Sequence, residues 1–227
     1  MEFAQIINYL QFAAVLAIPV LLAITVHEAA HGWVANRLGD PTAQQLGRVT
    51  FNPIKHVDLV GTVVVPALTF VFLHGLLFGW AKPVPVTPHR LRQPRRDMAL
   101  VALAGPAVNL LMALAWSLLI ITAPMLALVS NGLATTLAHM SAAGVVVNLF
   151  LMALNLVPLL PLDGGRVMTG ILPPRAAGWF YRAEPFGLVI LLMLLMTGLL
   201  GSVLMPVVTG IVNLLPGSAM VNALFFH

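Results

Sequence analysis

Long apolar segments that carry almost no charge constrain this chain more than any other feature of its sequence. Hydrophobic residues make up 60% of the 227 residues and charged residues only 8%, whereas soluble domains usually carry about 25% charged residues. A helix needs about 20 apolar residues to cross a bilayer, so this length accommodates roughly four to six crossings. The pattern therefore predicts an all-α integral membrane protein of four to six helices, with no room for a sizeable soluble domain.

Four segments are long and apolar enough to be predicted as membrane helices. They cover residues 6–34, 98–123, 133–157 and 186–204. Two further apolar segments, 57–78 and 206–226, are ambiguous because glycine and proline interrupt them. We treat residues 1–227 as one polytopic domain, with a motif-bearing core over about 6–172 and C-terminal helices over about 186–227.

Positive charge indicates the orientation of these helices, since Lys and Arg in short loops collect on the cytoplasmic side of a membrane. Arg37, Arg48 and Lys55 follow the first helix, and Lys82 with four arginines between positions 90 and 96 precedes the second. These loops share one side only if segment 57–78 enters the membrane and returns, which we favour over a full crossing. The N-terminus is then outside, and the first and third helices both end inside. No basic run interleaved with aromatic residues points to nucleic acid.

The strongest chemical signal is His27-Glu28-Ala29-Ala30-His31, an HExxH sequence near the inner end of the first predicted helix. Residues four apart share one face of an α-helix, so the two imidazoles can bind one metal ion. Zinc suits such ligands and lowers the pKa of its bound water to about 7, and Glu28 is placed to act as general base. Ordinary polar residues at a helix end are the alternative, but ionisable groups inside a membrane are costly and usually functional.

A catalytic zinc usually has three protein ligands, so a third must come from elsewhere. The chain contains no cysteine that could serve. A metzincin would place a further histidine six residues after His31, but that position is Arg37, and a thermolysin-like enzyme would supply a glutamate from the following helix, but the next glutamate after Glu28 is Glu184. Asp163 is the better candidate, because the third predicted helix ends just before it on the same side as the end of the first. Two prolines break that helix and two glycines permit a close turn. The alternative is a loop aspartate that caps the next helix.

These motifs together resemble the site-2 protease family of intramembrane zinc metalloproteases. The resemblance rests on HExxH and on the sequence Asn-x-x-Pro-x-x-Pro-Leu-Asp-Gly from Asn155 to Gly164. It extends to Gly-Pro-Ala-Val-Asn at 105–109, and to Asn-Pro-Ile-Lys-His-Val-Asp at 52–58 and Gly-Trp-Ala-Lys-Pro-Val-Pro-Val at 79–86, which look like a bacterial subgroup. The similarity covers about residues 26–166.

The resemblance implies a protease that cleaves the transmembrane helix of a single-span membrane-protein substrate within or near the bilayer, as in regulated intramembrane proteolysis. Carried over by position, the ligands of one Zn²⁺ are His27, His31 and Asp163. Glu28 would be general base and acid, Asn155 would contact the substrate backbone, and Asn109 would line the substrate path. The resemblance also implies a multi-pass protein of the bacterial cytoplasmic membrane with its active site toward the cytoplasm. We expect a minimal member without the PDZ insert or CBS tail of many relatives, which leaves substrate selection open.

Two other functions compete with this interpretation. A divalent-metal transporter or carrier would also place His and Asp inside the membrane, but it would give Glu28 no task and would need further ligands along a pathway. A metal-binding but proteolytically inactive scaffold is the other alternative, and the intact Glu28 argues against it. The sequence does not identify the substrate, the oligomeric state or the signal that regulates cleavage.

Two neighbouring segments carry further predictions. The tract Lys82-Pro83-Val84-Pro85-Val86 cannot be helical, because closely spaced prolines remove donors and force an extended backbone. Such an extended edge could pair with an unwound substrate strand. We interpret His56 and Asp58 as a hydrogen-bonded structural pair or as residues of an interfacial turn, in preference to residues that shape the site.

Overall fold

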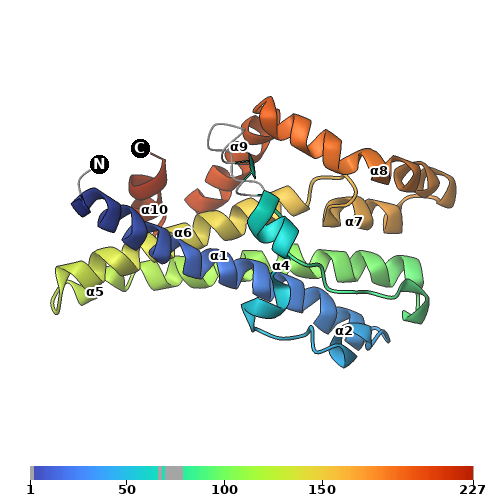
Figure 1. Cartoon of the computed structure of the whole chain (residues 1–227), viewed down its shortest axis with the longest axis horizontal. Coiled ribbons are helices and arrows are strands. Elements are labelled where there is room, and N and C mark those ends of the chain that lie inside the picture. The colour runs from blue at the N-terminus through green and yellow to red at the C-terminus, as the bar shows by residue number, and fades with distance from the viewer. Residues whose placement is uncertain (1–2, 66–67, 70–78, 227) are drawn as a thin grey trace.

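Three long helices form the body of the molecule. The computed structural model describes residues 3–65, 68–69 and 79–226, and the regular elements of these residues are all helical. Helices α1 (Phe3–Arg37), α4 (Pro94–Ile120) and α6 (Asn131–Asn155) pack side by side (Figure 1). With α8 (Pro174–Met196), four helices are long and apolar enough to cross a membrane. The prediction of an all-α membrane protein is confirmed.

Short helices connect and follow these long ones. Between α1 and α4 lie α2 (Thr42–Gln45), η1 (Pro53–His56), η2 (Leu59–Val64) and η3 (Pro88–Arg90); α5 (Ala123–Leu126), α7 (Asp163–Ile171), α9 (Leu199–Leu214) and α10 (Ser218–Phe225) complete the chain. The N-terminal end of α1 lies toward one end of the bundle, together with α5 and α10, and α2 and α7 lie toward the other end (Figure 1). Helices α1 and α6 therefore run in the same direction, as the charge pattern predicted.

The structure confirms the first three predicted helices to within four residues and corrects the fourth. The helix predicted over 186–204 begins at Pro174 and ends at Met196, and a separate helix, α9, follows. Gly198 divides them in the left-handed conformation, with φ of 72°, which glycine adopts without a Cβ clash. The tail predicted to begin at Pro206 is therefore no separate segment, because Pro206 lies inside α9.

The first described residues after segment 57–78 lie next to residues near its beginning. The backbone N–H of Trp80 donates to the carbonyl of Gly61 at 3.0 Å, and the Thr62 hydroxyl donates to the carbonyl of Trp80 at 3.0 Å. The chain thus returns to the place from which it left, as the re-entrant interpretation requires and a straight crossing does not. Residues 66–67 and 70–78 of this segment lie outside the described part of the chain.

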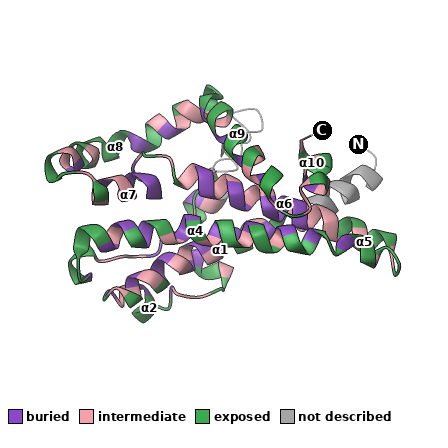
Figure 2. Cartoon of the chain, turned by 180° about the vertical axis from the view of Figure 1, so that it is seen from behind, coloured by how far each residue is buried: buried purple, intermediate pink, exposed green. Residues whose placement is uncertain are grey.

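Small residues allow α4 and α6 to approach each other closely, as is common between membrane helices. Ala142 and Ala143 are buried, and a Cβ on Gly144 would collide with the indole of Trp116. Because the two helices are antiparallel, this contact also places Gly105 of α4 at about the level of the end of α6. Figure 2 shows buried residues concentrated where α1, α4 and α6 meet, whereas α8 is largely exposed.

Candidate metal centre

Three buried side chains, two from α1 and one from the start of α7, meet at one point. The Nε2 atoms of His27 and His31 lie 3.0 Å apart. The Oδ2 atom of Asp163 lies 3.2 Å from the first and 3.3 Å from the second. Each of the three residues is less than a tenth exposed. The predicted ligand set of His27, His31 and Asp163 is therefore brought together, although Asp163 is 132 residues beyond His31 in the sequence.

This triangle has the dimensions of a zinc site. Ligand atoms at about 2.0–2.1 Å from a tetrahedral zinc lie about 3.3 Å from one another, close to the observed separations. The tautomer of His31 is also suitable, because its Nδ1 donates to the carbonyl of Val101 at 2.7 Å and leaves Nε2 with a free lone pair. The lone pair on His31 Nε2 and the Asp163 carboxylate are both electron-rich, so a cation between them would stabilise their close approach. The residues present therefore fit one zinc ion.

Helix α4 packs directly against the two imidazoles. Gly105 faces both rings, since a Cβ at this position would lie 2.6 Å from the Nε2 atoms of His27 and His31. Only a residue without a side chain fits there. The Gly-Pro-Ala-Val-Asn sequence carries part of the family resemblance, but the spacing of residues along the chain indicates neither this packing nor the hydrogen bond to the Val101 carbonyl.

The turn between α6 and α7 carries Asp163 to the site. Helix α6 ends at Asn155, and α7 begins with Asp163 itself. A Cβ on Gly164 would collide with the carbonyl oxygens of Leu156 and Val157, so the glycine lets the turn fold tightly on itself, as predicted. The guanidinium of Arg95 fixes the far end of α7 by donating to the carbonyls of Thr169 and Leu172.

The carboxylate of Glu28 is half-buried and has a partner that sequence reasoning missed. Its Oε2 accepts a hydrogen bond of 2.8 Å from the backbone N–H of Val84. Val84 lies in residues 82–87, which we call the strap; the strap is neither helix nor strand, and the prediction of a non-helical tract is confirmed. Glu28 thus lies beside the ligands His27 and His31 with its position set by a distant segment.

Neither of the two predicted substrate residues is part of the group of ligands; Asn109 lies one turn beyond Gly105 on α4, and Asn155 ends α6. The amide of Asn155 donates to the carbonyl of Leu151 at 2.9 Å, one turn earlier in α6. Asn109 is fully buried, and neither polar atom of its side chain has a hydrogen-bond partner in the described part of the chain. Contact of Asn155 or Asn109 with a substrate stays a prediction.

His56 and Asp58 serve the loop before the strap. The ring of His56 bonds to the carbonyl of Thr50 at 3.1 Å, and the carboxylate of Asp58 caps η2 by accepting from Gly61 N–H at 2.7 Å. Both contacts stabilise the local turn, and the two residues bond to separate partners instead of to each other.

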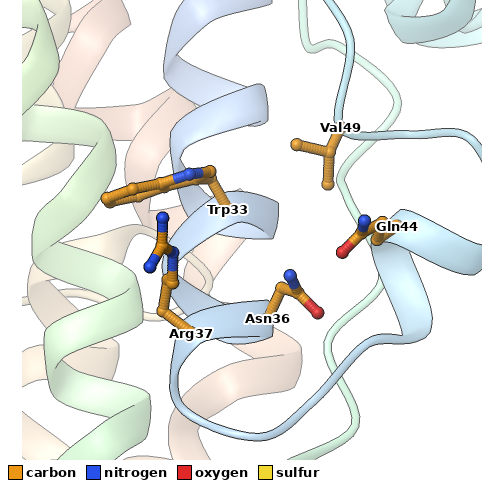
Figure 3. A pocket seen from close by; sticks show the side chains of 5 residues that line it. All are labelled: Trp33, Asn36, Arg37, Gln44 and Val49. Atoms are coloured by element: carbon orange, nitrogen blue, oxygen red, sulfur yellow. The ribbon is translucent and has the colours of Figure 1, made fainter.

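Two cavities flank α1 and the strap. One, of about 520 Å³, is lined by strap residues 83–86 together with Met98, Leu160 and Tyr181 of α4, the α6–α7 turn and α8. The other, of about 510 Å³, lies between α1 and the α2 region, where Arg37 stacks on Trp33 (Figure 3). Trp33 is two residues beyond His31, about 200° around the helix, so the second cavity opens on the opposite face of α1 from the ligands. The first cavity is lined by Val84, the residue that bonds to Glu28, whereas the second cavity is not.

Comparison with known proteins gives relatives over most of the chain. It is 37% identical over 196 residues to "Putative zinc metalloprotease YwhC" of Bacillus subtilis (strain 168), a match that covers 84% of each chain. Two proteins of the same description, each named Rip2, are also similar. The one from Mycolicibacterium smegmatis is 30% identical over 78% of this chain and 64% of its own, and that from Mycobacterium tuberculosis is 32% identical over 77% and 63%. No protein-family model and no solved structure matched. The extent of the first similarity shows that this chain belongs to the site-2 protease family.

Proposed function

We propose that this protein is an intramembrane zinc metalloprotease that hydrolyses a peptide bond in or near the transmembrane helix of a single-span membrane protein. One observation carries the proposal: His27, His31 and Asp163 form a zinc-sized triangle beside Glu28 on a helix apolar and long enough to cross a membrane. We further propose that this centre faces the cytoplasm from a bacterial cytoplasmic membrane, and the positive charges in the loops on its side of the bundle support this orientation.

The residues of the centre divide the chemistry between them. When bound, zinc activates a water for attack and polarises the scissile carbonyl. His27, His31 and Asp163 would hold the ion, and three protein ligands are the number typical of a catalytic zinc. Glu28 accepts a proton from the attacking water and passes it to the leaving amine. No side chain of this set needs to form a covalent bond with the substrate.

The cavity of about 520 Å³ is the best candidate for the path of the substrate. Val84 lines it and also bonds to Glu28, so one residue of the cavity wall contacts the general base. A helical substrate must unwind before its peptide bond can be attacked, and unwound backbone groups need new hydrogen-bond partners inside a membrane. The N–H of Val86 has no partner in the described residues and is placed to pair with such a backbone. Asn155 is proposed as a second contact, and Asn109 as a residue of the path.

The transporter and scaffold alternatives receive less support. Within the described residues, His27, His31 and Asp163 form the one group of three potential ligands, whereas a transport pathway needs a succession of such sites. A scaffold needs no carboxylate held beside the ligands, yet Glu28 is fixed there by a hydrogen bond.

Matched measurements on the purified protein and its Glu28→Gln variant test the proposal. Zinc content is measured on both, together with cleavage of a single-span test substrate in liposomes. We expect one zinc per chain in both and cleavage by the wild type alone, with a loss of about 10²–10⁴-fold in the variant. Cleavage that survives the substitution, or a wild type that binds zinc but cleaves no such substrate, would refute it.

A further inference from the structure

We infer that the peptide N–H of Val84 is a positioning donor, which fixes the carboxylate of Glu28 so that the general base faces the metal centre. The inference rests on the proposed function and adds a role that the HExxH sequence does not contain. Its basis is the 2.8 Å hydrogen bond from Val84 N–H to Glu28 Oε2, which joins residues 56 apart in sequence.

The strap is anchored on both sides of Val84. The buried guanidinium of Arg48 donates to the carbonyl of Lys82 at 2.8 Å and reaches that of Pro83 at 3.4 Å. At the other end, Thr87 N–H donates to the Asp40 carboxylate at 2.5 Å. Charged groups form each of these bonds, and such bonds are stronger than neutral ones. The strap is therefore held in place before any substrate arrives.

The side chain of Val84 fixes the position of its amide along α1. Val84 is 6% exposed, and it packs against α1 at Gly32, where a Cβ would lie 3.0 Å from the Val84 methyl carbon Cγ1. Gly32 is one turn beyond Glu28 on the same face of the helix. The missing side chain at Gly32 thus lets the strap lie close enough for the hydrogen bond to form.

The sequence of the strap provides one donor at this point. Pro83 and Pro85 have no N–H, and each proline also holds the residue before it in an extended conformation. Val84 therefore presents a single N–H on a stiff backbone between two residues that cannot donate. This arrangement supplies a reason for the alternating prolines, which a simple connecting loop would not need.

The consequence for catalysis concerns orientation. A glutamate side chain that is only half-buried can adopt several rotamers, and most of them point a carboxylate oxygen away from the ion. With Oε2 held by Val84 N–H, Oε1 remains available for the attacking water. A misplacement of about 1 Å in a catalytic group can cost on the order of 10²-fold in rate. Loss of the Val84 donor should therefore lower kcat and leave both zinc binding and KM nearly unchanged.

Two proline substitutions separate this role from substrate binding. Val84→Pro removes the donor and keeps an extended backbone and a side chain of similar size. Val86→Pro removes an N–H that has no partner in the described residues and lies at the cavity proposed for the substrate. We expect Val84→Pro to lower kcat by about 10–100-fold, with KM within about twofold and zinc content unchanged. Val86→Pro should raise KM in preference to lowering kcat, and Val84→Ala, which keeps the N–H, should lose less activity than Val84→Pro.

A spectroscopic measurement tests the contact without relying on activity or on the folding of a proline variant. In protein labelled with ¹⁵N-valine, Val84 is assigned as the amide resonance that disappears in Val84→Ala. We expect its proton resonance to lie downfield and to move upfield in Glu28→Gln, because a carboxylate is a stronger acceptor than an amide. A Val84 resonance unaffected by Glu28→Gln, or a Val84→Pro variant with wild-type kcat, would overturn the inference and leave the proposed protease function intact. A wild type that cleaves nothing would refute the function, and the resonance would still decide the contact.

Discussion

Substitution of Gly105 by alanine tests how closely α4 packs beneath the metal ligands. The added Cβ would lie 2.6 Å from the Nε2 atoms of both His27 and His31, whereas ordinary van der Waals contact begins at 3.4 Å. The nearest ring atom, Cε1 of His27, would lie only 2.4 Å away, so one or both rings must retreat by up to about 1 Å, or α4 must move away from α1. Metal–ligand distances tolerate a change of only about 0.2 Å. We expect at least one imidazole to leave the ion.

The loss in zinc affinity should exceed that of an outer-shell substitution, which typically costs 10–100-fold. We therefore expect Gly105→Ala to weaken zinc binding by at least about 100-fold, or about 2.7 kcal/mol. Competition with a chromophoric chelator measures this affinity on protein purified in detergent. The matched control is Gly178→Ala on α8, where an added Cβ meets no heavy atom within 4 Å. That control should leave zinc affinity unchanged, and a Gly105→Ala variant within about threefold of wild-type affinity would contradict the packing argument.

Three further predictions concern the third ligand, the turn that carries it and the anchor of the strap. Asp163→Asn replaces a charged ligand by a neutral amide, and we expect zinc affinity to fall by at least about 100-fold while circular dichroism shows unchanged helix content. Gly187→Ala adds a Cβ that collides with a backbone carbonyl of the α6–α7 turn, so thermal unfolding should show a loss of about 1–3 kcal/mol; an unchanged Tm would contradict the contact. Asp40 lies beyond the end of α1: burial would raise the pKa of its carboxyl, but hydrogen bonds from Thr42 and Thr87 outweigh it and hold the pKa below its usual value. A pKa lower in the folded than in the unfolded chain stabilises the protein above about pH 3.9, and this stability is lost as the pH falls through the folded pKa. The Tm of the wild type should therefore drop more steeply below about pH 4 than that of Asp40→Asn, and parallel curves would refute this.

The sequence predicted the parts of the structure that depend on local pattern. Apolar length located α1, α4 and α6, because a membrane helix must satisfy its backbone internally and leaves a long uncharged segment. The period of the helix brought His27 and His31 to one face. The prolines before Asp163 and the glycines after it marked a tight turn at the same end of the bundle.

The parts that pattern could not predict depend on contacts between distant segments. The predicted boundaries of α8 were wrong because hydropathy locates an apolar segment but does not show at which residue the helix begins or ends. The helix begins at Pro174 and is ended by Gly198. The contact of Gly105 with two imidazoles and the hydrogen bond from Val84 to Glu28 follow from how α4 and the strap pack on α1. Neither contact has a periodicity that the sequence displays.

Zinc K-edge X-ray absorption of the purified protein tests the central claim most directly, since it reports the ligands of the ion itself. The account predicts one zinc per chain in a first shell of nitrogen and oxygen at about 2.0–2.1 Å, with the outer-shell features of two imidazoles. The Asp163→Asn variant should lose this zinc or show an altered first shell. A protein that retains no zinc, a shell with three or more imidazoles, or a spectrum unchanged by Asp163→Asn would contradict the claim that α1 and α7 together hold the catalytic metal.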